Sequence, residues 1–203
     1  MITVITGVNG AGKSSIAGVW IRDAGGEYFN PDEVARQLQS QEPKLSQYAA
    51  NGQAWQMGFD YLLNAIKHDS DYTFETTLGG NTITQSLLDA IEKGVHIRII
   101  YVGLSSAELH IERVQYRVSQ GGHDIPEDKI WERYSRSIHN MMTLLPGCVE
   151  VLVLDNSSPI LNGKPGIKKL FGIKSGKITI VTQDLPAWAK PLATVALKNF
   201  HSE

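Results

Sequence analysis

Hydrophobic and polar positions follow two different periods along this chain. Short runs rich in β-branched or aromatic residues predict strands near residues 2–5, 27–30, 72–75, 95–102 and 149–154. Between these runs, apolar residues recur every three to four positions and predict helices near residues 15–22, 31–41, 82–93, and on both sides of a loop at 120–124. Because the predicted strands alternate with predicted helices, we expect a parallel sheet with helices on both faces.

Several predicted helices carry end signals. Asn30 is an N-cap candidate followed by Pro31 at the first helical position, and residues 105–108 have the form of a capping box. A long helix is expected after Pro43. Its apolar stripe consists of Trp55, Phe59, Leu62 and Ile66.

The pattern changes after Asp155. Residues 156–165 are rich in turn formers, residues 167–173 and 177–181 predict a hairpin, and a short helix is expected from about Pro186. We therefore predict a core over residues 1–155, and a hairpin and helix over residues 156–203 that are appended to the same domain.

Composition narrows the class of protein. A chain of 203 residues suits one domain, and a formal net charge of −2 argues against a dedicated nucleic-acid binder. The one cysteine, Cys148, cannot form an intrachain disulfide, so a reducing cytoplasm is the expected location and a buried structural thiol the expected role. No signal peptide and no apolar run of membrane-spanning length are visible, so no membrane partner is expected.

Residues 7–14 carry the strongest chemical signal. They read Gly-Val-Asn-Gly-Ala-Gly-Lys-Ser, which fits G-x-x-x-x-G-K-[ST] at every specified position, between a predicted strand and a predicted helix. Such a loop points backbone N–H groups at phosphates, while its lysine reaches the β- and γ-phosphates and its serine hydroxyl can hold Mg²⁺. A chance glycine turn is disfavoured because motif, strand and helix agree. The predicted nucleotide contacts are Gly7, Asn9, Gly10, Ala11, Gly12, Lys13, Ser14 and Ser15, with Ser14 as the metal ligand.

Acidic residues follow three predicted strands: Asp32, Glu75 and Asp155. Ligands of parallel α/β sheets bind at this edge, so Asp32 could accept a proton from a substrate hydroxyl or hold Mg²⁺ through water. The alternative is a charge that only complements the helix dipole, and spacing alone does not separate the two. For Asp155 a structural role is favoured, although residues 151–155 have the form of a Walker B strand.

A second candidate group is cationic. Arg113 and Arg117 lie at i and i+4, whereas Lys129, Arg133, Arg136 and Asn140 share one arc of the next helix. The loop at residues 121–123 could act as a hinge, which would make residues 113–136 a lid over phosphates. The alternative is a solvated surface with ordinary ion pairs to Glu112, Glu127 and Glu132.

With these motifs in place, the sequence resembles the zeta-toxin-like P-loop kinases. The likeness covers about residues 1–155. It rests on residues 7–14, Phe29-Asn30-Pro31-Asp32, Phe74-Glu75-Thr76-Thr77 and Ile111-Glu112-Arg113. It implies a three-layer P-loop kinase fold with strand order 2-3-1-4-5. It also implies transfer of the ATP γ-phosphate to the 3′-hydroxyl of UDP-N-acetylglucosamine, by a toxin held in check by an antitoxin protein.

The resemblance also implies roles for single residues. Lys13 and Ser14 would bind ATP and Mg²⁺, Asp32 would be the base, Glu75 would contact the substrate with Thr76 beside it, and Arg113 would contact the transferring phosphate. His123 stands where the family places a second arginine, so Arg117, Arg133 or Arg136 is expected to supply the missing charge. Residues 78–81 depart from the toxins' pattern, which leaves the acceptor open.

Three functions are compatible with these observations. The leading one is a small-molecule kinase that phosphorylates a hydroxyl of a nucleotide sugar or another nucleotide metabolite. The alternatives are a regulatory ATPase of AAA type, and a nucleotide-dependent binding module whose partner is a protein such as an antitoxin.

Overall fold

A single sheet organises the chain in the computed structural model, which describes residues 1–159 and 166–202. Within these residues the sheet has seven strands in the order β2-β1-β3-β4-β5-β6-β7. The strands are β1 (Ile2–Thr6), β2 (Tyr72–Thr76), β3 (Ile97–Gly103), β4 (Glu150–Asp155), β5 (Lys168–Lys174), β6 (Lys177–Val181) and β7 (His201–Ser202). The first four are parallel, whereas β5 pairs antiparallel with both β4 and β6.

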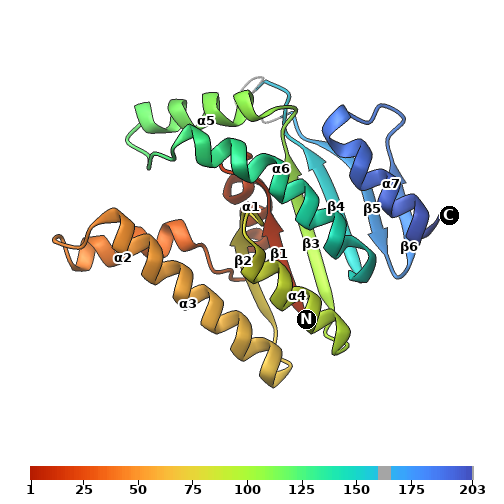
Figure 1. The fold of residues 1–203 in the computed structure, drawn as a ribbon, viewed down its shortest axis with the longest axis horizontal. Coiled ribbons are helices and arrows are strands. Elements are labelled where there is room, and N and C mark those ends of the chain that lie inside the picture. Colours follow the sequence, from red (N-terminus) through yellow and green to blue (C-terminus); the bar gives the residue numbers. More distant parts are fainter. Residues whose placement is uncertain (160–165, 203) are drawn as a thin grey trace.

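Helices cover both faces of this sheet. They are α1 (Lys13–Asp23), α2 (Pro31–Gln41), α3 (Gln47–His68), α4 (Asn81–Glu92), α5 (Ala107–Ser119), α6 (Glu127–Leu144) and α7 (Lys190–Asn199). In Figure 1, α1 lies behind the sheet, and α4, α6 and α7 lie in front of it. The predicted three-layer P-loop kinase fold is therefore confirmed. Among the described helices, none has the length and apolar character needed to cross a membrane.

The strand predicted at residues 27–30 is reduced to one bridge, between Phe29 and Phe74. Phe29 N donates to Thr73 O at 2.8 Å, and Glu75 N donates to Phe29 O at 2.9 Å. Pairing stops there because the next residues form the cap and first turn of α2 and because Pro31 has no N–H to donate. If this bridge is counted as strand 2, the predicted order 2-3-1-4-5 holds across the parallel half of the sheet.

The C-terminal hairpin matches its predicted bounds within one residue, but it extends the central sheet. Strand β5 pairs antiparallel along the free edge of β4, so the predicted parallel core continues into the hairpin and the complete sheet is mixed. Trp188 also packs tightly against β3, because a Cβ on Gly103 would lie 2.3 Å from its ring. Its Nε1 donates to Asp155 Oδ1 at 3.4 Å, in agreement with a structural role for this acid.

Helix α3 uses most of the predicted stripe, but its buried face is wider and richer in small residues. Leu62 is fully buried and Phe59 and Ile66 pack against the core, whereas Trp55 is 42% exposed. The other buried residues of α3 are Ala50, Ala54, Gly58 and Ala65. The small side chains allow a close approach, because a Cβ on Gly58 would lie 2.6 Å from the Phe29 ring. Helices α2 and α3 form an arm that reaches away from the sheet (Figure 1).

Helix α5 begins one residue later than the capping-box pattern suggested. Ser106 is the N-cap, and its side chain accepts from Leu109 N at 3.3 Å. The buried face of α5 consists of Ala107, His110 and Val114, so a histidine occupies a core position of this helix.

Cys148 is buried beside the sheet, as expected for a structural thiol. Its Sγ donates to Leu144 O at 3.3 Å, and burial raises its pKa to about 12. Because the thiolate is the reactive form, this cysteine is chemically quiet at neutral pH.

Candidate functional site

The residues between β1 and α1 form a phosphate-binding loop. Gly7 has φ 141° and Gly12 has φ 88°, a range that side chains other than glycine rarely adopt. A Cβ on Gly7 would lie 2.0 Å from Val102 O, so the loop can pass β3 only with glycine there. Gly12 caps α1 without a side-chain hydrogen bond, which leaves the first N–H groups of the helix available to an anion.

Two cavities adjoin at this loop. The P-loop cavity, of about 510 Å³, is lined by residues of the loop and of the start of α1 together with Glu75, Arg113 and Arg117. The α4 cavity, of about 470 Å³, is lined by Trp55, Arg133 and residues 76–80, which lead from β2 into α4, among others. Four residues line both cavities: Asn9, Asp32, Asn51 and His123. A side chain in this shared wall can reach ligands in both cavities.

Most of the predicted nucleotide contacts line the P-loop cavity: Asn9, Gly10, Gly12, Lys13, Ser14 and Ser15. Gly7 and Ala11 are buried and lie outside its lining. These two residues therefore shape the loop, and the residues around them present its polar groups.

Glu75 lies against the P-loop residues Lys13 and Ser14. Its Oε1 is 3.5 Å from Lys13 Nζ, and its Oε2 accepts from Ser14 Oγ at 2.7 Å. The Glu75 and Lys13 side chains are 8% and 7% exposed, respectively. Glu75 lines the P-loop cavity and is absent from the lining of the α4 cavity, so it stands beside the predicted metal ligand. Thr76, the next residue on β2, lines the α4 cavity.

Arg113 and Arg117 both reach the P-loop cavity from α5. Arg113 Nη2 donates to Asn156 O at 2.6 Å, and burial lowers the pKa of its guanidinium. Arg117 Nη2 donates to His123 O at 2.7 Å, while its buried Nε has no partner among the described residues. Each arginine is therefore held by a backbone carbonyl of a nearby loop while it lines the P-loop cavity, and the lid over residues 113–136 stays a prediction.

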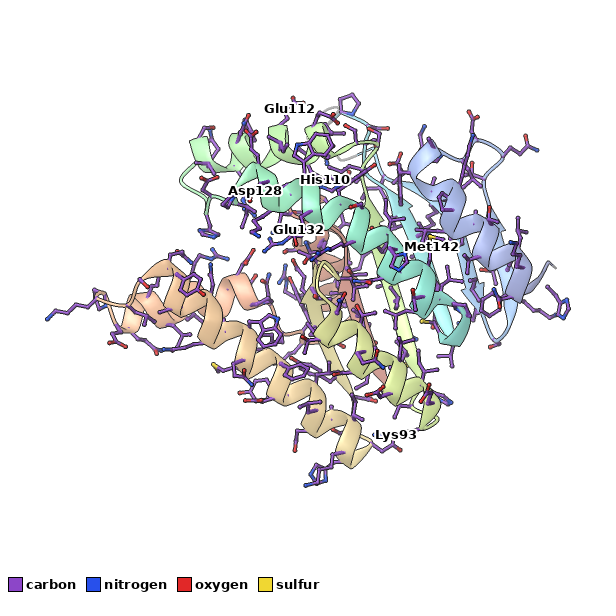
Figure 2. The ribbon with its side chains drawn as sticks, viewed as in Figure 1. Lys93, His110, Glu112, Asp128, Glu132 and Met142 are labelled. Carbon is purple, nitrogen blue, oxygen red and sulfur yellow. The ribbon has the colours of Figure 1, made fainter. Side chains whose placement is uncertain are left out.

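The arginines of α6 separate in space. Arg133 Nη1 donates to Asn9 Oδ1 at 2.7 Å, and burial lowers its pKa while nearby Asp32 acts in the opposite direction. Arg136 is not brought into the site, because its Nη1 pairs with Glu132 Oε1 at 2.6 Å on the surface. Lys129 binds the same carboxylate at 3.0 Å, so this part of α6 follows the alternative of ordinary surface ion pairs. Glu132 is labelled in Figure 2.

Asp32 lies in the first turn of α2 and in the wall shared by the two cavities. Its backbone N–H donates to Asn30 Oδ1 at 3.0 Å, as expected for the predicted cap. Two other residues of this shared wall also lie close together: His123 Nε2 is 3.5 Å from Nδ2 of Asn51 on the arm. Asp32, Thr76, His123 and Arg133 are therefore brought together around the α4 cavity.

Two residues near the P-loop were not identified from the sequence. His110, 1% exposed and labelled in Figure 2, donates from Nδ1 to Asn9 O at 2.8 Å. Burial is the main cause that lowers its pKa to about 4, so the ring is neutral at neutral pH. The one available signal in the sequence was spacing: His110 lies three residues after Ala107 and four before Val114, which places it on the buried face of α5. Asn156 Nδ2 donates to Ala11 O at 2.9 Å across 145 positions, a contact that no local pattern announces.

Comparison with known structures supports the fold. A chain of the AvrRxo1-ORF1:AvrRxo1-ORF2 complex with ATP superposes with a TM-score of 0.68 at 12% identity. The likeness covers 97% of this chain, which spans 63% of the length of that one. The PezAT toxin–antitoxin system of Streptococcus pneumoniae gives a TM-score of 0.56 at 14% identity, covering 98% of this chain and 78% of that one. The resemblance to the zeta-toxin-like kinases is thus confirmed for the fold.

Sequence comparison identifies the family. An uncharacterized protein of Haemophilus influenzae is 34% identical over 128 residues, which are 63% of this chain and 88% of that protein. The AAA_33 family, described as an AAA domain, matches residues 2–139. Since this match covers more than half of the chain, the protein belongs to the AAA_33 family and has its P-loop kinase-like fold.

Proposed function

We propose that the protein is an ATP-dependent kinase that transfers the γ-phosphate to a hydroxyl of a small molecule. The acceptor class is a nucleotide sugar similar to UDP-N-acetylglucosamine, or another nucleotide metabolite. The observation that carries the proposal is the pair of adjoining cavities with Asp32 in the wall of both. A triphosphate in the P-loop cavity would direct its terminal phosphate toward an acceptor in the α4 cavity.

On the donor side, the P-loop N–H groups would bind the phosphates, and Lys13, Arg113 and Arg117 would stabilise the charge of the transferring group. The oxygen groups of Ser14 and Glu75 fit Mg²⁺, which prefers hard oxygen ligands and keeps several waters. Ser14 Oγ would hold the ion directly. When bound, the ion neutralises charge on the β- and γ-phosphate oxygens.

On the acceptor side, Asp32 would take the proton of the attacking hydroxyl. The acceptor oxygen forms the new bond to phosphorus, the bond between phosphorus and the β,γ-bridging oxygen breaks, and ADP leaves. Thr76, His123 and Arg133 would orient the acceptor from the α4 cavity, and the exposed Trp55 ring offers a flat surface for stacking.

The test is direct. The protein is incubated with ATP and UDP-N-acetylglucosamine, and then with a panel of nucleotide sugars and a metabolite extract, and products are identified by mass spectrometry. We expect a product heavier by one phosphate, and none from Lys13→Ala, which loses a phosphate ligand. Phosphate release without any phosphorylated metabolite would contradict the kinase proposal.

A regulatory ATPase is the second candidate, because the family is described as an AAA domain. Two observations count against it. The carboxylate of Asp155, which ends the strand of Walker B form, already accepts hydrogen bonds from Ser157 and Trp188. AAA-type ATPases usually add a helical domain after the core, whereas the residues described after β4 contain one α-helix, α7. A nucleotide-dependent module bound by an antitoxin is the third candidate, and the likeness of its fold to a chain of the PezAT toxin–antitoxin system motivates the search for such a partner.

A further inference from the structure

The hydroxyl of Ser14 has a nearly complete set of partners without any ligand. A hydroxyl can donate one hydrogen bond and accept two. Ser14 Oγ donates to Glu75 Oε2 at 2.7 Å, and a carboxylate has no hydrogen to give in return. Asn30 Nδ2, a group that can only donate, occupies one lone pair of Ser14 Oγ at 3.3 Å. One lone pair is left for a further partner.

The opposite end of the same amide holds the helix that carries Asp32. Asn30 Oδ1 accepts from Asp32 N at 3.0 Å and from Glu33 N at 3.4 Å. These two bonds fix which end of the amide is oxygen, and therefore which end faces Ser14. Asn30 is 4% exposed, so its side chain cannot rotate without leaving buried polar groups unpaired.

We propose that Asn30 is a positioning residue that aims the free lone pair of Ser14 at the magnesium ion and fixes Asp32 relative to it. With Glu75 holding the hydroxyl proton and Asn30 holding one lone pair, the remaining lone pair has a single direction. Because Asn30 also caps α2, the metal ligand and the proposed base are held by one side chain. The proposal rests on the proposed function for the identity of the metal–nucleotide ligand.

A cap alone does not require an amide. Serine is about as good an N-cap as asparagine, because capping uses only the side-chain oxygen. Asn30→Ser therefore keeps the cap and removes the donor to Ser14. Ser46→Ala is the matched control, since Ser46 caps α3 through Ala49 N, whereas the hydrogen-bond partners of Ser14 Oγ are Glu75 and Asn30.

The experiment measures metal binding directly. Mn²⁺, used as a spectroscopic substitute for Mg²⁺, is titrated by electron paramagnetic resonance into each protein with the non-hydrolysable analogue adenylyl imidodiphosphate. We expect Asn30→Ser to keep its thermal midpoint and to weaken Mn²⁺ binding about ten- to hundredfold, the usual size for a group that orients a metal ligand. Ser46→Ala should lower the thermal midpoint and leave Mn²⁺ binding unchanged.

A double-mutant cycle tests whether the effect passes through Ser14. In a Ser14→Ala background, Asn30→Ser should cause no further loss of Mn²⁺ affinity. Unchanged Mn²⁺ binding in Asn30→Ser, or an equal loss in both backgrounds, would overturn the proposal. Because no acceptor is involved, a protein that transfers no phosphate can still pass this test, and an active kinase can still fail it.

Discussion

At the scale of the residue, Asp32 is the side chain on which the proposed chemistry depends most. Asp32→Asn keeps its shape and removes the proton acceptor, so we expect nucleotide affinity to change little and transfer to fall about a hundredfold or more. If Asp32 only complements the dipole of α2, the mutant should instead lose about 0.3–1 kcal/mol of stability with transfer intact. Thermal midpoint, ATP affinity and transfer rate measured on this one variant separate the two roles.

Arg113 should act mainly on the transferring phosphate. Arg113→Ala is expected to slow transfer more than it weakens ATP binding, because the charge that it stabilises is largest in the transition state. Arg98→Ala is a suitable control, since Arg98 pairs with Glu150 and lines neither the P-loop cavity nor the α4 cavity. Equal transfer rates in the two variants would contradict a role for Arg113 in catalysis and leave it only the structural role of holding Asn156.

His110 should make the stability of the folded protein depend on pH. Its pKa is about 4 in the folded protein and ordinarily about 6.5, so between these values the unfolded chain binds the extra proton. Stability should therefore fall as pH decreases from about 6.5 to 4, by roughly 1–3 kcal/mol from this group. Urea unfolding of His110→Gln over the same range should show a flatter profile, and a profile as steep as that of the wild type would contradict this assignment.

At the scale of the element, the packing of α3 predicts opposite effects on stability for two glycine-to-alanine substitutions in the same helix. A Cβ on Gly58 would lie 2.6 Å from the ring of Phe29, so Gly58→Ala should destabilise the protein by about 1–3 kcal/mol through overpacking. Gly52 lies in the same helix with nothing within 4 Å of its Cβ position. Gly52→Ala should therefore stabilise the protein by about 0.5–1 kcal/mol. Denaturant unfolding that gave both variants the same sign would contradict this packing.

The periodic elements were well predicted from the sequence because local rules determine them. The P-loop, the cap of α2 and the hairpin all carry their signal within a few residues. The exceptions depended on distant partners. The strand at residues 27–30 shrank because Pro31 ends its pairing, and α3 turned its small residues inward because Phe29 lies against Gly58.

The candidate site was predicted less completely for the same reason. Arg133 and Arg136 are three positions apart on one helix, so periodicity gave them the same face. Only tertiary position puts Arg133 beside Asn9 and Arg136 beside Glu132. Glu75 likewise sits at the end of its strand as expected, but the parallel pairing of β2 with β1 directs it to Ser14.

At the scale of the whole molecule, we propose that the C-terminal segment and the core unfold as one unit. Trp188 packs on Gly103 and donates to Asp155, and the next residue, Asn156, donates to Ala11 of the P-loop. Trp188→Ala should lower the free energy of unfolding by about 3–5 kcal/mol. It should also weaken nucleotide binding, because Asn156 loses its fixed position.

Trp188→Phe is the control, because it keeps an aromatic ring and loses the hydrogen bond from Nε1. It should therefore lose less stability and less nucleotide affinity than Trp188→Ala. The measurements are calorimetric unfolding and nucleotide titration. Two separate unfolding transitions in the wild type, or a Trp188→Ala variant with unchanged nucleotide affinity, would contradict the coupling.

The burial of Cys148 makes the native protein convenient for site-specific labelling. It is the only cysteine, and its raised pKa leaves almost no thiolate for maleimide reagents to attack. Tyr48 on the arm is 90% exposed, and Tyr116 on α5 is 70% exposed. A Tyr48→Cys, Tyr116→Cys variant would therefore accept a donor and an acceptor dye with little background, and energy transfer between them would report the distance between the arm and α5 as nucleotide is added.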